Sequence, residues 1–293
     1  MILCHSGVAE SRHAGKGGLG MTYIDVVVLG LVLGICETLP VSGSGHLAML
    51  RHFFGYSAVL EDHLAVLAFI RLGIMAAVIA GCWPVCKDLA RVFFSAFDTN
   101  RAVRESGRAA RRLLLLLALA TLPLFLLLAV QSRVQTLYEN PFFIGFAFLA
   151  SGLLLFGANR VRRGGKTGKN ATLWDALAVG FVQLLAILPG FSRTGAGIAA
   201  GLHRRFDREF AVQFSLLLYL PAGLGASILT LARAGGFDWH FLLKYALAFL
   251  TAGLAAYGSI RLLNYIAKRG SFGGFCYYCW GAGLVTLVLS LVA

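Results

Sequence analysis

Long apolar runs separated by short basic loops make up the chain from about residue 23 onward. Eight such runs can be distinguished, at 23–39, 62–83, 112–130, 140–158, 173–189, 210–232, 241–263 and 273–292. A helix needs about 20 residues to cross the roughly 30 Å of bilayer hydrocarbon, and most of these runs reach that length. The pattern therefore predicts an all-α polytopic membrane protein.

The first 22 residues are small and polar and precede the first apolar run. They have no apolar centre, and no small-residue cleavage site follows the first run, so we do not interpret them as a secretory signal peptide. Met21 is an alternative start of translation. We expect a polar extension over 1–22 and a single membrane domain over 23–293.

Two of the apolar runs, 23–39 and 173–189, differ from the others in how they end. Each leads into a proline and then into a stretch rich in Gly, Ser and Thr. Non-helical backbone at membrane depth is tolerated only where protein or a water-filled cavity surrounds it. We therefore predict two re-entrant hairpins, whose returning half-helices lie over about 46–57 and 195–203.

The distribution of basic residues tests this arrangement. Most of the 26 Lys and Arg residues fall in or beside four loops, at 84–111, 159–170, 203–209 and 261–270. If both hairpins are re-entrant, all four loops lie on one side, which the positive-inside rule makes cytoplasmic. If both hairpins crossed fully, 159–170 and 203–209 would lie on opposite sides. The charges therefore favour two re-entrant hairpins and about six transmembrane helices.

The two halves of the domain follow the same plan, with one hairpin and three spans in each. Because each half crosses the membrane an odd number of times, the second half begins on the opposite side and is inverted relative to the first. We therefore expect an inverted repeat, with repeat one over about 23–158 and repeat two over about 171–293. Hairpins that enter from opposite faces can meet near the midplane, as in inverted-repeat transporters.

Composition agrees with this fold and excludes other classes. Hydrophobic residues are 58% of the chain and charged residues only 13%, whereas charged residues are about 25% of an ordinary soluble domain. The net charge of +13 lies in loops, so we expect a membrane and no nucleic acid as partner. Cys276 and Cys279 have the spacing of half a zinc site but lack a matching second pair, so we interpret the six cysteines as small buried hydrophobes.

The tips of the two hairpins carry the candidate chemistry. Their polar and small residues are Glu37, Ser42, Gly43, Ser44, Gly45 and His46 in the first tip, and Ser192, Arg193, Thr194 and Gly195 in the second. Glycines let backbone N–H groups approach a ligand, and helix starts favour anions. The guanidinium of Arg193 is a forked donor suited to phosphate oxygens. The tips therefore predict a phosphate pocket.

Glu37 and His46 make this pocket a candidate reactive site. They have the chemistry of a general base and a general acid, and Glu37 is also a candidate ligand for a divalent cation such as Mg²⁺ or Ca²⁺. Structural roles are the alternative, because His at a helix start, hydroxyls in membrane helices and an Arg near helix ends often serve packing alone. Ionisable residues inside a membrane are costly, which favours function for Glu37 and Arg193.

Two motifs then resemble a known family. Glu37-Thr-Leu-Pro-Val-Ser-Gly-Ser-Gly-His46 and Pro189-Gly-Phe-Ser-Arg-Thr-Gly195 are similar to the two motifs of the bacterial undecaprenyl-diphosphate phosphatases of the bacitracin-resistance type. The resemblance runs from about Tyr23 onward and includes Gln183 and the stretch 214–221. It implies an enzyme of the bacterial cytoplasmic membrane that removes the terminal phosphate of a polyprenyl diphosphate and so recycles the carrier lipid of cell-wall synthesis. It also implies an inverted repeat with two re-entrant hairpins.

The chain departs from the family pattern at three positions. Leu33 stands where the family has a first glutamate, Gly43 where it has a middle serine, and Arg71 where it has a glutamine. These departures remove one candidate base and one candidate nucleophile and add a cation. They shift the site toward anion binding.

Two functions remain open on these residues. In a diphosphatase, Arg193, Arg71 and the tip N–H groups would hold the diphosphate. The nucleophile would be Ser42 or Ser44, or else a water molecule activated by Glu37 or His46. His46 would also protonate the leaving oxygen. Ser192, Thr194, Gly43, Gly45 and Gly195 would complete the binding site. In a non-hydrolytic flippase, the same anion pocket would carry a polyprenyl phosphate across the membrane. A monomer and a homodimer are both compatible with the sequence.

Overall fold

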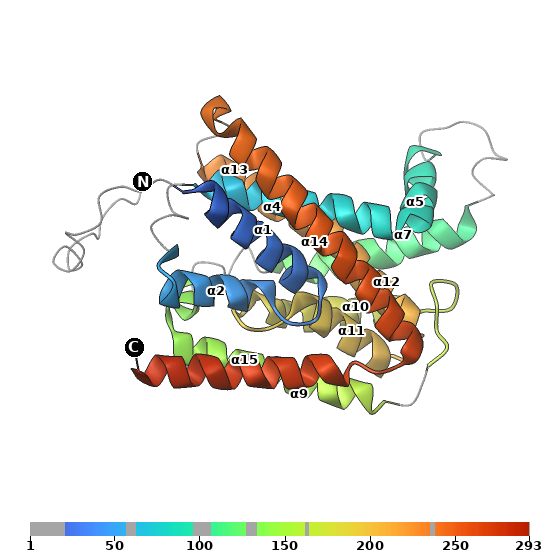
Figure 1. The fold of residues 1–293 in the computed structure, drawn as a ribbon. Coiled ribbons are helices and arrows are strands. Elements are labelled where there is room, and N and C mark those ends of the chain that lie inside the picture. The colour runs from blue at the N-terminus through green and yellow to red at the C-terminus, as the bar shows by residue number, and fades with distance from the viewer. Residues whose placement is uncertain are drawn as a thin grey trace.

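The computed structural model describes residues 21–56, 63–95, 107–126, 134–161, 164–234 and 238–292 (Figure 1). In these ranges the regular structure is helical, apart from one isolated bridge between Lys166 and Phe206. This confirms the predicted all-α fold. The predicted extension over 1–22 lies outside the described residues except for its last two positions.

The helices are packed as a bundle that includes two short helical hairpins (Figure 1). The helices longer than one turn are α1 (Tyr23–Thr38), α2 (Gly43–Phe53), α4 (Leu64–Gly81), α5 (Trp83–Ser95), α7 (Arg108–Thr121), α9 (Pro141–Asn159), α10 (Leu173–Gln183), α11 (Arg193–His203), α12 (Arg208–Leu217), α13 (Tyr219–Arg233), α14 (Leu242–Arg269) and α15 (Gly273–Val292). Four short 3₁₀ segments are η1 (Leu122–Phe125), η2 (Gln135–Glu139), η3 (Leu184–Ile187) and η4 (Trp239–Phe241).

Five helical stretches of the described chain are long and apolar enough to cross a membrane. They are Leu64–Gly81, Pro141–Asn159, Arg208–Arg233, Trp239–Arg269 and Gly273–Val292. Each coincides with an apolar run predicted to span. The remaining predicted span, 112–130, overlaps α7 and η1 and is described only as far as residue 126. The chain is therefore a multi-pass membrane protein.

Two details of the helices were not predicted. The run 210–232 consists of two helices, α12 and α13, that meet at Leu218. The loop predicted at 84–111 begins with helix α5, whose Trp83 and Phe94 are exposed and whose Lys87 and Arg91 interrupt the apolar pattern. Helix α5 is amphipathic, and a mixed pattern of this kind has no long apolar run that would identify it as a membrane span.

Each hairpin turns where a leucine precedes a proline. The proline ring disfavours helical backbone at the preceding residue, and Leu39 and Leu188 accordingly have extended ψ angles of 156° and 127°. The first hairpin returns as α2, which begins at Gly43, three residues before the predicted 46. The second returns as α11, which begins at Arg193, two residues before the predicted 195.

The two ends of each hairpin lie close together. The hydroxyl of Tyr56, just after α2, donates a hydrogen bond of 3.1 Å to Asp25 in the first turn of α1. Arg204, just after α11, donates one of 2.7 Å to Asp175 in the first turn of α10. Each chain segment therefore enters and leaves at the same end, as a re-entrant hairpin requires. The side of the membrane on which each end lies stays a prediction.

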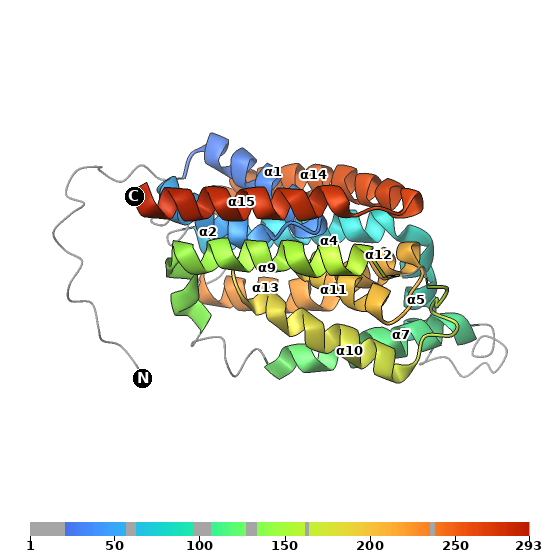
Figure 2. The same ribbon diagram turned by 90° about the horizontal axis from the view of Figure 1, so that it is seen from below.

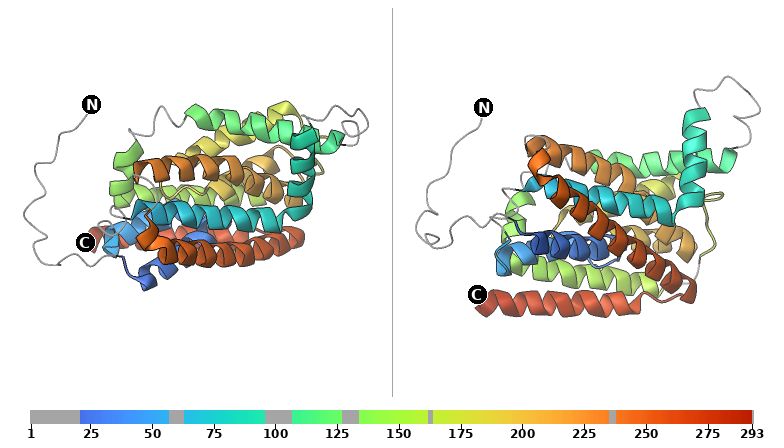
Figure 3. Two further views of the ribbon diagram at one scale, coloured as in Figure 1. Left: turned by 90° about the horizontal axis from the view of Figure 1, so that it is seen from above. Right: turned by 45° about the horizontal axis from the view of Figure 1, so that its top comes forward.

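Some helix pairings between the halves of the chain are reciprocal, although the extensive packing of α4 on α14 has no comparable counterpart of α13 on α7 among the described residues. Helix α1 packs along α14 and α10 packs along α7, while α9 lies beside α15 and α4 beside α13 (Figures 2 and 3). An inverted repeat would produce such an exchange, because equivalent helices of the two halves then take equivalent partners. The repeat and its boundaries at 23–158 and 171–293 stay a prediction.

Candidate functional site

The two hairpin tips are in direct contact. The hydroxyl of Thr194 donates a hydrogen bond of 2.8 Å to the backbone oxygen of Glu37. An added Cβ on Gly45 would lie 2.7 Å from the Cα of Gly190, so glycine is needed for the two backbones to approach. The two tips therefore lie side by side, and their place near the membrane midplane stays a prediction.

Both returning helices begin with the same capping arrangement. Ser42 Oγ accepts a hydrogen bond of 3.1 Å from the N–H of Gly45, and Ser192 Oγ accepts one of 3.0 Å from the N–H of Gly195. Side-chain oxygens at this position satisfy N–H groups that the helix itself leaves unpaired. The two hydroxyls are buried and serve the helix starts, whose positive dipole ends favour an anion nearby.

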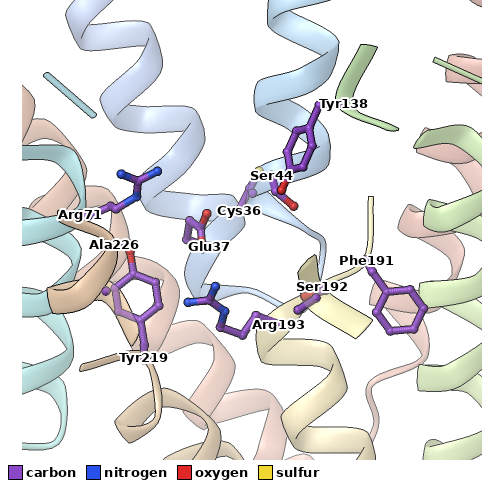
Figure 4. A pocket seen from close by; sticks show the side chains of 13 residues that line it. Cys36, Glu37, Ser44, Arg71, Tyr138, Phe191, Ser192, Arg193, Tyr219 and Ala226 are labelled. Carbon is purple, nitrogen blue, oxygen red and sulfur yellow. The ribbon is translucent and has the colours of Figure 1, made fainter. Parts of the chain in front are cut away.

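A pocket of about 130 Å³ lies between the tips. Residues of both hairpins and of α4, η2, η3 and α13 line it: Cys36, Glu37, Gly43, Ser44, Arg71, Tyr138, Ala186, Phe191, Ser192, Arg193, Tyr219, Gly223 and Ala226. Figure 4 shows the side chains of Arg71, Glu37, Arg193 and Tyr219 pointing toward one common space.

Positive charge dominates this pocket. It contains two guanidinium groups, those of Arg71 and Arg193, and one carboxylate, that of Glu37. Nη1 of Arg71 donates a hydrogen bond of 2.7 Å to Thr230 Oγ1, which fixes the Arg71 side chain. Within the described part of the chain, neither guanidinium forms an ion pair with a carboxylate. A multivalent anion would therefore find charge-assisted donors from two different helices, α4 and α11.

Glu37 lies over the start of α2 because residue 43 is a glycine. An added Cβ on Gly43 would lie 2.6 Å from Cγ of Glu37 and 2.8 Å from its Oε1. A side chain at position 43 would thus have to displace the carboxylate. The departure from the family motif at Gly43 and the position of Glu37 are physically coupled.

His46 does not line the pocket. Its Nδ1 lies 2.7 Å from the backbone oxygen of Ser42, and its Nε2 lies 2.7 Å from the hydroxyl of Tyr278 on α15. Because a carbonyl oxygen only accepts hydrogen bonds, Nδ1 carries a proton, and in the neutral form of His46 the Nε2 atom accepts a hydrogen bond from Tyr278. The ring therefore holds the first tip against α15, one layer behind the pocket wall.

The predicted site residues fall into two groups. Glu37, Gly43, Ser44, Arg71, Ser192 and Arg193 line the pocket, whereas Ser42, Gly45, His46, Thr194 and Gly195 support it from behind. Leu33, where the family has its first glutamate, is 5% exposed in the apolar core and does not line the pocket.

Sequence analysis missed two tyrosines of the pocket wall. Tyr138 comes from η2 and donates a hydrogen bond of 3.2 Å to the backbone oxygen of Ile187. Tyr219 comes from the first turn of α13 and is buried. Both lie in or beside apolar runs, where a tyrosine carries no signal of its own. Only the similarity of the stretch 214–221 to the family drew attention to the second.

A metal ion would find a sparse set of protein ligands here. Among the described residues there is no group of three or more His, Cys, Asp or Glu side chains. Glu37 is the carboxylate of the pocket. Mg²⁺ is often bound by one or two carboxylates together with substrate phosphates, and this donor set fits only that mode.

These features together define the class: a multi-pass membrane protein with a cationic, anion-binding pocket between two helix starts. The chain belongs to the family described as bacitracin resistance protein BacA, whose sequence model matches residues 26–285.

Several relatives match the chain over almost all of its length. Proteins named undecaprenyl-diphosphatase from Syntrophotalea carbinolica and Desulforapulum autotrophicum are each 34% identical, over 92% and 91% of this chain and 100% and 98% of their own length. The protein of the same name from Methanosphaera stadtmanae is 31% identical over 92% of this chain and 98% of its own.

Proposed function

We propose that this protein is an undecaprenyl-diphosphatase, which removes the terminal phosphate of undecaprenyl diphosphate and leaves the monophosphate. The observation that carries the proposal is the convergence of Arg71, Arg193 and Glu37 in one pocket between two helix starts. Relatives that match the chain over almost its whole length bear this name. The reaction would recycle the carrier lipid of cell-wall synthesis and would account for resistance to bacitracin, after which the family is named.

Binding of the diphosphate would rest on groups from both tips. Arg193 and Arg71 would each donate to phosphate oxygens, because the planar guanidinium matches their spacing. Ser44 is the hydroxyl of the first tip on the pocket wall and would add a donor. The starts of α2 and α11 would contribute backbone N–H groups and favourable dipoles.

Hydrolysis would proceed by attack of water with Glu37 as general base. The water oxygen bonds to the terminal phosphorus, the bond from that phosphorus to the bridging oxygen breaks, and its electron pair stays on the monophosphate. Glu37 accepts the proton of the attacking water. The guanidinium groups of Arg71 and Arg193 stabilise the negative charge that develops in the transition state.

Water is the nucleophile that we propose, and Ser44, whose residue lines the pocket, is the alternative among the serines of the first tip. Position 43 has no hydroxyl, and Ser42 Oγ is buried and caps α2. His46 lies behind the pocket wall, so we assign it the role of holding the tip rather than protonating the leaving oxygen.

A divalent cation stays a proposal. Glu37 and the oxygens of the bound diphosphate would hold Mg²⁺ or Ca²⁺, which would neutralise phosphate charge. In this mode the cation depends on the substrate for most of its ligands, so we expect its affinity for the free protein to be low.

The flippase alternative is not favoured. Its strongest support is the expected inverted symmetry, which suits alternating access. The relatives that match along nearly the whole chain are, however, named as diphosphatases.

Phosphate release from undecaprenyl diphosphate by the purified protein, with and without chelator, tests the proposal. Arg193→Lys keeps the charge but loses the fork, so we expect kcat/KM to fall at least about tenfold. Arg160→Lys is the matched control, because Arg160 contacts Phe156 away from the pocket. No phosphate release, together with transfer of polyprenyl phosphate between the leaflets of vesicles, would establish the flippase instead.

We further propose that the protein resides in the bacterial cytoplasmic membrane, where its substrate is produced. A homodimer stays a prediction. The mass of the detergent-solubilised protein, measured by light scattering, would distinguish it from a monomer.

A further inference from the structure

Tyr219 has a polar group that the described structure leaves unused. Its side chain is 4% exposed, and its hydroxyl has no hydrogen-bond partner among the described residues. A buried hydroxyl without a partner is unfavourable, because it has lost the hydrogen bonds it would make with water. Such a group in a native structure calls for an explanation, and a bound water molecule or ligand is one.

The position of this hydroxyl indicates what that molecule is. Tyr219 lines the pocket, and Figure 4 shows its ring directed into the space that Arg71, Glu37 and Arg193 also face. A ligand that occupies this space meets two guanidinium groups, so it is an anion. A phenol hydroxyl can donate one hydrogen bond to an anionic oxygen.

The backbone is arranged to make room for the ring. Tyr219 begins α13, directly after the break at Leu218, and Gly223 follows it by one helical turn. An added Cβ on Gly223 would lie 2.9 Å from Cε1 of Tyr219. Glycine at 223 therefore lets the ring lie along α13 with its hydroxyl end in the pocket.

We propose that Tyr219 is a substrate-binding residue that donates a hydrogen bond to an oxygen of the diphosphate held by Arg71 and Arg193. This inference rests on the proposed function for the identity of the natural ligand. The binding role itself concerns any diphosphate anion in the pocket. Inorganic pyrophosphate is therefore a probe that does not depend on hydrolysis.

The decisive variant is Tyr219→Phe, which keeps the ring and removes the hydroxyl. We expect the affinity for pyrophosphate, measured by titration calorimetry, to fall about tenfold, because a hydrogen bond to a charged group is lost. We expect KM for undecaprenyl diphosphate to rise by a similar factor. Tyr245→Phe is the matched control, because Tyr245 is equally buried at 4% but lies outside the pocket.

Stability separates a binding role from a structural one. The ligand-free Tyr219→Phe variant should unfold at the same temperature as the wild type or higher, since it loses an unpaired buried donor. The rise in unfolding temperature on adding pyrophosphate should shrink. A variant that is destabilised without ligand but binds pyrophosphate like the wild type would show a structural role and overturn the proposal.

Gly223→Ala provides a second variant that keeps the tyrosine. Its methyl group should push the ring and weaken pyrophosphate binding in the same direction. Wild-type protein that binds pyrophosphate but releases no phosphate from the lipid would refute the proposed function and leave the role of Tyr219 supported. Wild-type protein that does not bind pyrophosphate would overturn the inference itself.

Discussion

The hydroxyl of Thr194 in the second hairpin hydrogen-bonds the backbone oxygen of Glu37 in the first, at 2.8 Å. Glu37 lies in the last turn of α1, where carbonyl oxygens have no partner within the helix. The backbone oxygen of Thr194 in turn accepts a hydrogen bond of 3.0 Å from Ser215 on α12. A short chain of hydrogen bonds therefore ties the residue that carries the pocket carboxylate to the second half of the molecule.

Thr194→Val should weaken this connection. Valine has nearly the same shape but no hydroxyl, so the partly buried Glu37 oxygen would lose this partner, at a cost of about 0.5–1.5 kcal/mol. We expect a lower unfolding temperature in detergent and a lower turnover of undecaprenyl diphosphate. Thr194→Ser keeps the hydroxyl and is the control. Equal stability and turnover in the two variants would show that the hydrogen bond is dispensable.

Glu37→Gln tests the proposed base. Glutamine keeps the size and most hydrogen bonds but cannot accept a proton from water. General-base catalysis contributes about 10²–10⁴-fold to rate, so we expect kcat to fall on that scale while binding of the lipid is largely kept. Glu209→Gln, an exposed change on α12, is the control. Undiminished hydrolysis by Glu37→Gln would exclude Glu37 as the base and leave Ser44 as the candidate nucleophile on the pocket wall.

Gly43→Ser tests the coupling between position 43 and Glu37. The new side chain restores the family motif but would lie within 2.6 Å of the Glu37 side chain, which must move. We expect phosphate release to fall. Gly258→Ser is the control, since an added Cβ at Gly258 meets no atom within 4 Å. Higher activity in Gly43→Ser would mean instead that the pocket accepts the serine and gains a nucleophile.

Asp175 should make stability depend on pH. Its carboxylate is buried, outside the five candidate spans, and accepts hydrogen bonds of 2.8 Å from Lys166 and 2.7 Å from Arg204. Burial alone would raise its pKa, but the hydrogen bonds, that from Lys166 foremost, lower the pKa from 3.8 to about 2.

A carboxyl group whose pKa is lowered by folding stabilises the fold fully at pH values above the pKa that it has in the unfolded chain. This stabilisation should therefore be present above about pH 5 and be lost as the pH falls through 3.8 toward 2. Lys166 and Arg204 are partly exposed, so solvent weakens their ion pairs with Asp175. We therefore expect Asp175→Asn to lower the free energy of unfolding by about 1–3 kcal/mol near neutral pH. The variant should also lose less stability than the wild type when the pH falls. Unfolding in detergent between pH 6 and pH 2 measures this, with the surface change Asp88→Asn as control. An unchanged acid profile in Asp175→Asn would exclude the carboxylate as its source.

Cysteine labelling in a cysteine-free background tests the topology. Gly165→Cys, in the exposed loop before α10, should react with a membrane-impermeant reagent only from the cytoplasmic side. Glu139→Cys, at the exposed end of η2, should react only from the opposite side. The reverse pattern would contradict the predicted orientation, and reaction of both positions from one side would contradict α9, which lies between them, as a membrane span.

Local physical rules were enough to predict much of this molecule. Apolar runs of sufficient length specify helices that cross a bilayer, whatever their neighbours are. The Leu-Pro pairs at 39–40 and 188–189 end both incoming half-helices by steric conflict within two residues. Arg193 and Glu37 could be assigned to a site because charged groups at membrane depth are too costly to be incidental. The fold class, the hairpin tips and the main charged groups of the pocket were therefore evident from the sequence by itself.

Tertiary structure alone decided which side chains share the pocket. His46 and Ser44 are two residues apart, yet Ser44 lines the pocket and His46 faces Tyr278, because successive residues of a helix point in different directions. Tyr219 reaches the pocket from α13, more than 170 residues after Ser44. The direction of the Tyr219 side chain depends on the break between α12 and α13 at Leu218 and on the space left by Gly223. Contacts of this kind depend on how distant helices are rotated and packed against each other, and a local pattern of residues does not contain that information.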